Sequence, residues 1–321
     1  SGQRSADNGA GVRTQAGAGR EIMSDTAASL RRKIDNAKDL RSVVSTMKAL
    51  AAASIGQYEK SARALEDYHR TVQLGLSVCF RANGLHGFSV AKKNTGVDCS
   101  VTGAVIFGSD QGLVGQFNDS IAEHAARALA PLPGRKKIWV VGERVHDRLA
   151  DLGLVIEGSF TVPLSIQMVT PLTWEIMLAV LGPGLRENEM AELYLFYNRP
   201  RSGSTHAPFH YRLLPLDEAW RRELSRLPWP ARNLPEVVGG NMATLPALIR
   251  EYLFVSLFRA CAESLASESA SRLAAMERAE KNIDELSGNL QQTFNRLRQS
   301  RIDAELFDVI AGVEAVREKA K

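Results

Sequence analysis

Apolar residues recur at alternating intervals of four and three near the start of the chain, which is the spacing of a coiled-coil seam. Asp25 and Thr26 are suitable helix caps just before this pattern. The seam positions are Leu30, Ile34, Ala37, Arg41, Val44, Lys48, Ala51, Ile55, Tyr58, Ala62, Leu65, His69, Val72 and Leu76. No proline interrupts them, so we predict a helix of roughly 50 residues, about 75 Å long. A helix of that length with one apolar stripe needs a partner along it.

The last part of the chain carries a second seam of the same spacing. No proline occurs between Pro246 and Lys321, which allows a helix of roughly 70 residues. Its positions are Leu273, Met276, Glu280, Ile283, Ser287, Leu290, Phe294 and Leu297, and then, one residue out of register, Ile302, Leu306, Val309, Val313 and Val316. The shift predicts a local change in supercoiling. We predict that the terminal helices pair within one chain as a long antiparallel coiled coil, so function depends on what this shaft contacts.

Short apolar runs alternate with amphipathic stretches in the middle of the chain, which predicts an α/β domain. We expect strands at 101–107, 136–141, 191–197 and 209–214, and helices at 120–130, at 143–152 and from a Thr170-Pro171 cap to about Gly182. The last two strands should form a hairpin. Residues 215–246 contain five prolines and two adjacent glycines, which predicts an irregular connector. The predicted fold class is therefore α/β, with a Rossmann-like globular domain attached to the coiled coil.

Changes in composition divide the chain into four expected segments. These are a disordered leader at 1–23, an N-terminal coiled-coil helix at 24–80, the α/β domain and connector at 81–246, and a C-terminal coiled-coil helix at 247–321. The leader is rich in Gly, Ala, Ser and Arg without an apolar stretch, and Met23 is a candidate start. A mitochondrial transit peptide is a weaker interpretation, because Asp7 and Glu21 interrupt the segment.

Charge and cysteine usage exclude several classes of function. The chain has 40 basic and 36 acidic residues, for a net charge of +4, and they are too evenly interspersed for a nucleic-acid footprint. No apolar run approaches the roughly 20 residues of a membrane-spanning helix, so we expect no direct membrane insertion. Cys79, Cys99 and Cys261 are odd in number and have no CxxC spacing, which argues against a disulfide framework or a zinc site and fits a reducing cytoplasm.

The glycines after the first predicted strand raise the question of nucleotide binding. Gly108, Gly112 and Gly115 do not have the G-x-G-x-x-G spacing, and the chain has no G-x-x-x-x-G-K-[ST] motif. A tight turn that lets the strand pack against a helix is the simpler interpretation. The alternative function, a nucleotide-binding α/β enzyme with helical dimerisation arms, therefore lacks its phosphate motif.

Nucleophilic catalysis is the second chemistry to weigh. Ser109 and Asp110 could act with His124 or His146, but the loop lacks the G-x-S-x-G spacing of a nucleophile elbow. His69 lies on the apolar stripe of the first helix, where packing is more common than metal ligation. We predict no catalytic residue, no cofactor and no metal site in this chain.

Several motifs, in order along the chain, carry a family resemblance. They are Leu30 to Ile34, Thr46 to Ala53, Ser109 to Asn118, Leu195 to Arg199, Leu213 to Pro215, Glu263 to Glu268 with Ala270, Arg272, Ala275, Met276 and Asn282, Asn295 to Gln299 with Ile302 and Glu305, and Val309 to Gly312. Together they resemble the gamma subunit of F-type ATP synthases. The resemblance covers about residues 24 to 316.

The resemblance implies a non-catalytic rotor in a central stalk, which couples transmembrane ion flow to ATP synthesis or hydrolysis by rotation. The implied partners are the alpha and beta subunits of the catalytic ring, the epsilon subunit and the membrane c-ring, at the cytoplasmic face of the bacterial inner membrane, where the chain is peripheral. In the family, residues matching Arg298 and Gln299 contact a loop of beta, and those matching Met47 and Arg272 lie where helix packing affects coupling. Whether the ion is a proton or sodium depends on the membrane subunits.

The sequence departs from the family pattern at three places. Val114 stands where many relatives have a cysteine, Gly56-Gln57-Tyr58 replaces a more basic stretch, and the connector from Trp220 to Pro235 is unusual. We interpret these departures as marks of a divergent or alternative-operon copy.

Overall fold

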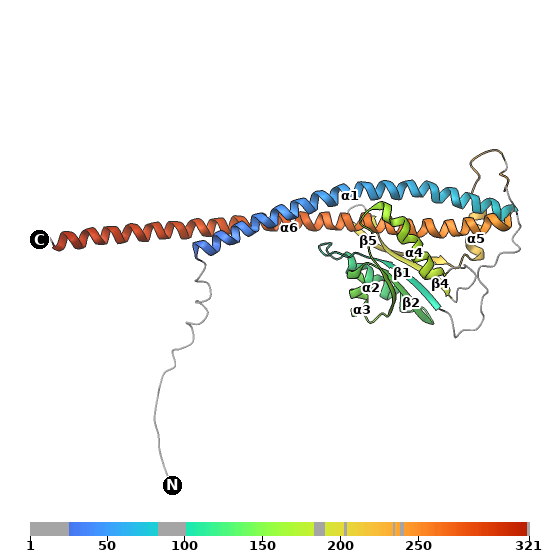
Figure 1. Ribbon diagram of the computed structural model, residues 1–321, viewed down its shortest axis with the longest axis horizontal. Coiled ribbons are helices and arrows are strands. Elements are labelled where there is room, and N and C mark those ends of the chain that lie inside the picture. The colour runs from blue at the N-terminus through green and yellow to red at the C-terminus, as the bar shows by residue number, and fades with distance from the viewer. Residues whose placement is uncertain are drawn as a thin grey trace, which may run out of the picture. The chain divides into compact units, whose positions relative to one another are not determined.

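The computed structural model describes residues 26–82, 101–182, 190–201, 204–233, 235–237 and 241–319 (Figure 1). The expected leader at 1–23, with Met23, and also Cys99 lie outside the described residues. The elements are α1 (Ala27–Ala82), β1 (Val101–Phe107), α2 (Phe117–Leu129), β2 (Arg135–Val141), α3 (Glu143–Asp151), β3 (Ile156–Phe160), the 3-10 turn η1 (Ile166–Met168), α4 (Val169–Leu181), β4 (Met190–Arg201), β5 (Ser204–Leu214), α5 (Glu218–Ser225) and α6 (Asn241–Lys319).

The five strands form one sheet in the order β3-β2-β1-β4-β5. β1 pairs in parallel with β2 and β4, and β5 closes the sheet as an antiparallel hairpin with β4. Parallel strands covered on both faces are apolar throughout, and β1 is buried from Thr102 to Phe107. The order β3-β2-β1-β4 is that of a doubly wound fold, which confirms the predicted Rossmann-like α/β class.

Each face of the sheet packs against different helices. Ala104 and Ile106 of β1 face α2 and α3, where Ile121 and Val145 are fully buried. Val105 and Phe107 alternate to the other face, where they share a core with α4, α1 and α6. The two terminal helices are therefore part of the core of the α/β domain and not only an appendage to it (Figure 1).

The structure corrects several predicted boundaries. β3 and α5 were not predicted, and α5 lies in the expected irregular connector, where Asp217 caps it by accepting from the Trp220 N–H at 2.9 Å. Thr170 is not the cap of α4, which already begins at Val169. α6 begins at Asn241, so Pro246 lies inside it. A proline this close to the helix start removes one backbone hydrogen bond and leaves the rest of the helix intact.

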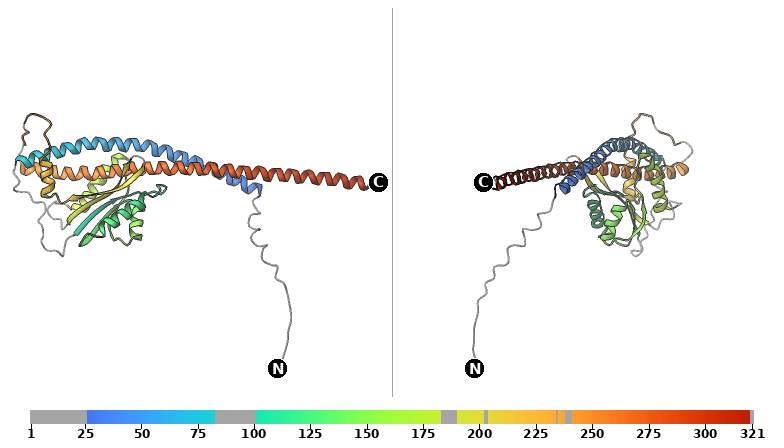
Figure 2. Two further views of the ribbon diagram at one scale, coloured as in Figure 1. Left: turned by 180° about the vertical axis from the view of Figure 1, so that it is seen from behind. Right: turned by 60° about the vertical axis from the view of Figure 1, so that its left-hand side comes forward.

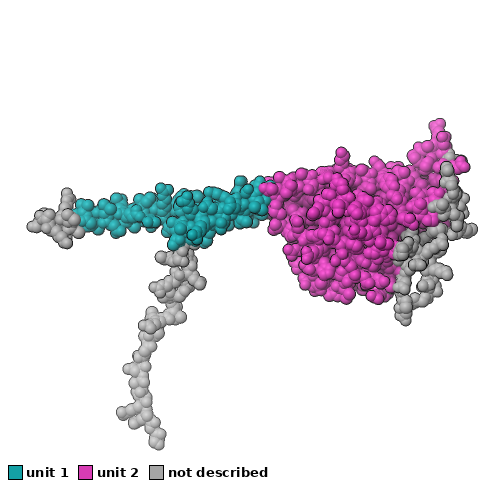
Figure 3. All heavy atoms as spheres, in the orientation of Figure 1, with its two compact units in different colours: residues 1–45, 279–321 teal, residues 46–278 magenta. Residues whose placement is uncertain are grey.

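The structure separates into two compact units, which are described one by one (Figure 3). Residues 46–278 form the α/β domain with the adjoining parts of α1 and α6. There, Glu66 lies 3.9 Å from Arg259, and the Tyr68 hydroxyl donates to Glu251 at 2.7 Å. Residue numbers rise along α1 while their partners' numbers fall along α6, so the helices are antiparallel, as Figure 2 also shows.

The other unit contains residues up to 45 and from 279 onward. Leu30, Ile34 and Ala37 of α1 are buried there, and Arg41 donates to Asp284 at 2.6 Å. Thr26 caps the helix, because its hydroxyl accepts from the Ser29 N–H at 3.3 Å. The predicted seam of α1 is confirmed, because all of its positions except Arg41 are buried or half-buried. Arg41 is 53% exposed and forms the ion pair with Asp284.

Candidate functional site

The loop after β1 is closed by its own hydrogen bonds. Ser109 is fully buried, its N–H donates to Asn118 Oδ1 at 3.0 Å, and its hydroxyl donates to the Gln111 carbonyl at 3.0 Å. The Asn118 amide donates to Ser109 Oγ at 2.8 Å. A nucleophilic serine needs a base within hydrogen-bond reach and an exposed hydroxyl. Ser109 has a buried hydroxyl engaged within its own turn, so the structural interpretation of the glycine loop is the better one.

The crevice that binds ligands in doubly wound folds is also filled by the protein. Such ligands sit between the carboxyl ends of the two strands where the strand order reverses, here β1 and β4. Asn198, near the end of β4, is fully buried and donates to the Phe117 carbonyl at 3.0 Å. The Asn198 carbonyl accepts from the hydroxyl of Ser267, a fully buried residue of α6, at 2.9 Å. Helix α6 thus covers the position a nucleotide would take, which argues against the enzyme alternative.

Asp110 joins the loops that follow three different strands. Its Oδ1 accepts from the Glu143 N–H at 2.9 Å and its Oδ2 from the Val162 N–H at 2.8 Å. Gly142 lies beside it with φ of 115°, and a Cβ there would come within 2.8 Å of the Ser109 nitrogen. The carboxylate is therefore a structural acceptor for two backbone amides.

The cysteines and His69 give no sign of metal chemistry. Cys79 and Cys261 are buried thiols, and burial raises the pKa of both, so each stays protonated at neutral pH. His69 stacks on Tyr252 with ring centroids 5.2 Å apart, and burial lowers the pKa of this histidine. Among the described residues, no group of three or more metal-ligating side chains is gathered.

Two histidines of the edge strand β5, His206 and His210, contact the helices α2 and α6. His124 Nε2 of α2 lies 2.8 Å from His210 Nδ1, and His206 Nε2 lies 3.2 Å from Ser120 Oγ of α2. The other ring nitrogen of His206 lies 2.7 Å from Ser271 Oγ of α6. Burial lowers the pKa of His124, with His210 and Arg127 adding to the effect, and burial lowers the pKa of His206.

These histidines should make the chain less stable in mild acid. A histidine whose folded pKa is depressed keeps its full contribution above its ordinary pKa of about 6.5 and loses it as the pH falls through the folded value. We expect the melting temperature to fall between pH 7 and pH 5, and His124→Phe to reduce that fall. His146→Phe, at a histidine of α3 with a 41% exposed side chain, is the control. Equal pH profiles for wild type and His124→Phe would contradict the assignment.

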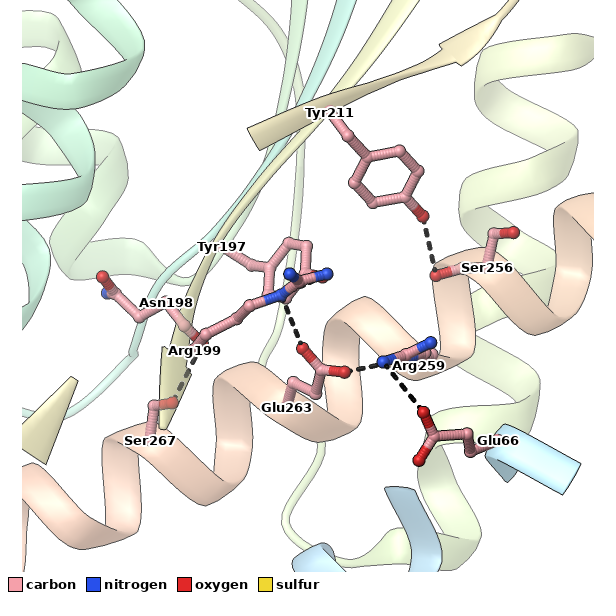
Figure 4. Close-up of polar contacts among 9 residues, drawn as sticks. All are labelled: Glu66, Tyr197, Asn198, Arg199, Tyr211, Ser256, Arg259, Glu263 and Ser267. Carbon is pink, nitrogen blue, oxygen red and sulfur yellow. Dashed lines mark hydrogen bonds and ion pairs between the residues drawn. The ribbon is translucent and has the colours of Figure 1, made fainter. Parts of the chain in front are cut away.

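A chain of alternating charges links the sheet to both helices (Figure 4). Arg199 of β4 donates to Glu263 Oε2 of α6 at 3.0 Å, and Arg259 donates to the other oxygen, Oε1, at 2.6 Å. Arg259 in turn lies 3.9 Å from Glu66 of α1. The Glu263 side chain is only 13% exposed, so this carboxylate is largely desolvated between two guanidinium groups.

Arg272 lies further along α6 and forms a separate, largely buried ion pair. It donates to Glu268 Oε1 at 2.7 Å, and the two side chains are 17% and 8% exposed. Burial raises the pKa of Glu268, and Arg272 opposes that rise. Both charges act on Tyr58 of α1, whose pKa is raised by burial and by Glu268 and lowered by Arg272. Met47 is half-buried on α1, about three turns before Tyr58.

Arg298 and Gln299 lie at a different place, on a part of α6 in the unit that contains residues from 279 onward. Both are exposed, and so is every described side chain of the helix from Asn295 to Val313. The seam positions are buried or half-buried as far as Phe294, and the described ones are exposed from Leu297 onward. Arg298 and Gln299 therefore make no interior contact that would explain them structurally.

Comparison with known proteins identifies the chain. The family model described as ATP synthase matches residues 26–316. This chain belongs to the ATP synthase gamma family. It is 26% identical to the ATP synthase gamma chain of Geotalea uraniireducens over 90% of this chain and 98% of that one. It is 31% identical to that of Syntrophus aciditrophicus, over 66% and 72% of the two chains.

Solved structures of the gamma family share the fold. A chain of the mitochondrial ATP synthase of Euglena gracilis, solved with OSCP, F1 and the c-ring, matches with a TM-score of 0.62 at 19% identity, over 92% of this chain and 96% of that one. A chain of the central stalk and c-ring of the Tetrahymena thermophila enzyme matches with a TM-score of 0.52 at 22% identity, over 74% and 99%. Gamma chains are non-catalytic, which agrees with the closed loop after β1.

The ion-pair cluster of Arg199, Glu263, Arg259 and Glu66 was not predicted from the sequence of this gamma family member. Its central pair joins residues 64 positions apart, Arg199 and Glu263. A signal was nevertheless present, because Arg199 ends the Leu195 to Arg199 motif and Glu263 begins the Glu263 to Glu268 motif.

Proposed function

We propose that this chain is the rotor of the central stalk of an F-type ATP synthase and couples transmembrane proton or sodium flow to ATP synthesis or hydrolysis by rotation. Its paired helices enter the ring of alpha and beta subunits, where ATP is bound. Its α/β domain contacts the epsilon subunit and the membrane c-ring. In this assignment the chain carries torque and performs no chemistry itself.

The observation that carries the proposal is the uncovered apolar end of α6. Seven large apolar side chains there are between 39% and 70% exposed: Leu297, Ile302, Leu306, Phe307, Val309, Ile310 and Val313. Exposed apolar surface of this extent marks a docking region. The inner wall of a surrounding ring would cover all sides of such a helix at once, as no single flat partner would.

Arg298 and Gln299 are proposed to contact the beta subunit, because they stand on this same uncovered end. Met47 and Arg272 are proposed as coupling residues of a different kind, which act through packing between α1 and α6. Met47 is half-buried on α1 and the Arg272 side chain is only 17% exposed on α6, so a change at either position would alter the packing around it.

The chain is proposed to be peripheral, held at the cytoplasmic face of a bacterial inner membrane by the c-ring. Among the described residues, no helix is both long enough and apolar enough to cross a bilayer. Attachment through a partner subunit is consistent with that finding.

Reconstitution tests the proposal. The chain is mixed with purified alpha and beta subunits of a related bacterial enzyme, and we expect a stable complex that hydrolyses ATP, while the chain alone neither binds nor hydrolyses it. Leu306→Asp with Val309→Asp should prevent assembly and leave the melting temperature of the free chain unchanged, because both side chains are exposed. Ser300→Asp, at an exposed polar position of the same helix, is the control. Micromolar ATP binding by the free chain, measured by calorimetry, would refute the proposal.

A further inference from the structure

The segment of α6 from Ala260 to Ser271, which makes polar contacts with the sheet through Glu263, Ser267 and Ser271, is rich in small buried side chains. Its buried α6 residues include Ala260, Ala262, Ser264, Ala266, Ser267 and Ser271. Small side chains let the helix approach the sheet closely, but the attraction between such surfaces is non-directional. This face alone would oppose separation of the two elements more strongly than it opposes rotation of the helix past the sheet.

The hydrogen bonds between the charged residues depend on orientation, whereas the contacts of the small residues do not. We propose that the Arg199–Glu263–Arg259 cluster, extended to Glu66, is the joint through which torque passes between the α/β domain and the paired helices. This inference rests on the proposed rotor function. Each charged hydrogen bond is directional and weakens steeply when its angle changes, so turning α6 against β4 breaks the Arg199–Glu263 contact first.

Arg199 is held in place before it meets its partner. Its guanidinium donates to the Tyr197 hydroxyl at 2.8 Å from Nε and at 2.6 Å from the terminal nitrogen, and it lies 3.5 Å from the centre of the Phe209 ring. Tyr197 itself is 1% exposed. The arginine is therefore a rigid extension of the sheet, so a force on the sheet reaches Glu263 with little loss in side-chain motion (Figure 4).

Glu263 distributes that force to both helices. Its two oxygens bind different arginines, Arg199 from the sheet and Arg259 from its own helix, and Arg259 reaches toward Glu66 of α1. Three further polar contacts between the hairpin strands and α6 involve neutral groups, Asn198 with Ser267, Tyr211 with Ser256 and His206 with Ser271. Neutral hydrogen bonds are about half as strong as charged ones, so the cluster is the stiffest of these links.

Removing the charge on one side should therefore loosen the joint. Loss of one charge-assisted hydrogen bond changes an equilibrium by about tenfold or more, so the population of rotors whose sheet has slipped against α6 should rise by that factor. In the assembled enzyme this appears as slip, meaning ATP hydrolysed without ion uptake. Arg199→Met keeps a long apolar side chain and removes the charge, and Glu263→Gln keeps the shape of the carboxylate.

The experiment measures ion uptake and ATP hydrolysis together in inverted membrane vesicles that contain the assembled complex. We expect slip to rise about tenfold in Arg199→Met and by at least as much in Glu263→Gln, which also weakens the contact with Arg259. The double variant should be no worse than Glu263→Gln alone, because Glu263→Gln already removes the charged contact with Arg199. Arg199→Lys keeps a charge without the planar fork and should lie in between. The control is Arg148→Met, which removes a 2.7 Å ion pair with Asp119 inside the α/β domain.

The outcomes separate the joint from the rotor function. If Arg199→Met slips no more than Arg148→Met, the joint is refuted while the rotor function stands. If the wild-type chain assembles no coupled complex, the rotor function itself fails. A purely structural role for Arg199 would lower the melting temperature of the free chain and leave slip at the level of the control, and that result would also overturn the joint.

Discussion

Replacing Arg298 and Gln299 together by alanine is expected to lower ATP turnover of the reconstituted complex by about ten- to a hundredfold. Arginine and glutamine offer donors suited to a carboxylate or a loop carbonyl on beta, and a charge-assisted hydrogen bond contributes about 1.5–3 kcal/mol. If that bond forms only in the transition state of one rotational step, its loss slows the step by this factor. Steady-state ATP hydrolysis at saturating ATP measures it.

The control for this double variant is Gln292→Ala with Arg296→Ala, the same residue types on the same exposed helix, seven and two residues before Gln299 and Arg298. Both double variants should keep the helicity and melting temperature of the free chain, because all four side chains are exposed. Turnover that falls equally in the two pairs would assign the effect to general loss of charge, and unchanged turnover would leave Arg298 and Gln299 as solvated surface residues.

Asp110→Ala is expected to lower the free energy of unfolding by about 3 kcal/mol or more. The substitution leaves the Glu143 and Val162 amides without their acceptor, and each hydrogen bond to a charged group contributes about 1.5–3 kcal/mol. Denaturant unfolding of the free chain measures the loss. Asp110→Asn keeps one carbonyl acceptor and should lose about half as much.

Asp147→Ala is the matched control for Asp110, since it removes a carboxylate of the same domain that is 59% exposed. A surface substitution of this kind usually changes stability by less than about 0.5 kcal/mol. If Asp110→Ala were as stable as Asp147→Ala but altered a nucleotide-dependent activity of the free chain, the catalytic interpretation of the Ser109-Asp110 pair would regain support.

The elements with a strong apolar pattern could be predicted from the sequence. β1 was predicted with its observed bounds because burial on both faces makes it a continuous apolar run. β3 has no such run, since Glu157 and Ser159 point to solvent in alternation with half-buried neighbours, and its pairing with β2 is what makes it a strand. α5 was hidden by the surrounding prolines, although Asp217 is a recognisable cap.

The candidate site was likewise predicted from the sequence only in part. The absence of a phosphate-binding motif was evident from spacing, and the closed contacts of Ser109 agree with it. The contact between Arg199 and Glu263 could not be predicted, because the two residues meet only after the sheet and α6 have packed. The motifs that contain them mark each residue but not their pairing. The roles of Met47 and Arg272 in coupling stay predictions, because they depend on how α1 and α6 pack within a complex of several chains.

The two hydrophobic clusters of the α/β domain draw on different stretches of the chain, and this sets the order in which they can form during synthesis. The cluster under α2 and α3 is made of residues between Ala104 and Phe196, so it can close as soon as that stretch has left the ribosome. The cluster on the opposite face needs residues from Tyr58 to Ala266.

At about 5–20 residues per second, the 70 residues between Phe196 and Ala266 take roughly 4–14 s to synthesise. Throughout that interval Val72 and Leu76, which end almost fully buried, have no α6 to cover them. The nascent chain therefore has one face of the sheet packed against α2 and α3 and the other face still exposed. The exposed face is where nascent chains would associate wrongly or recruit a chaperone.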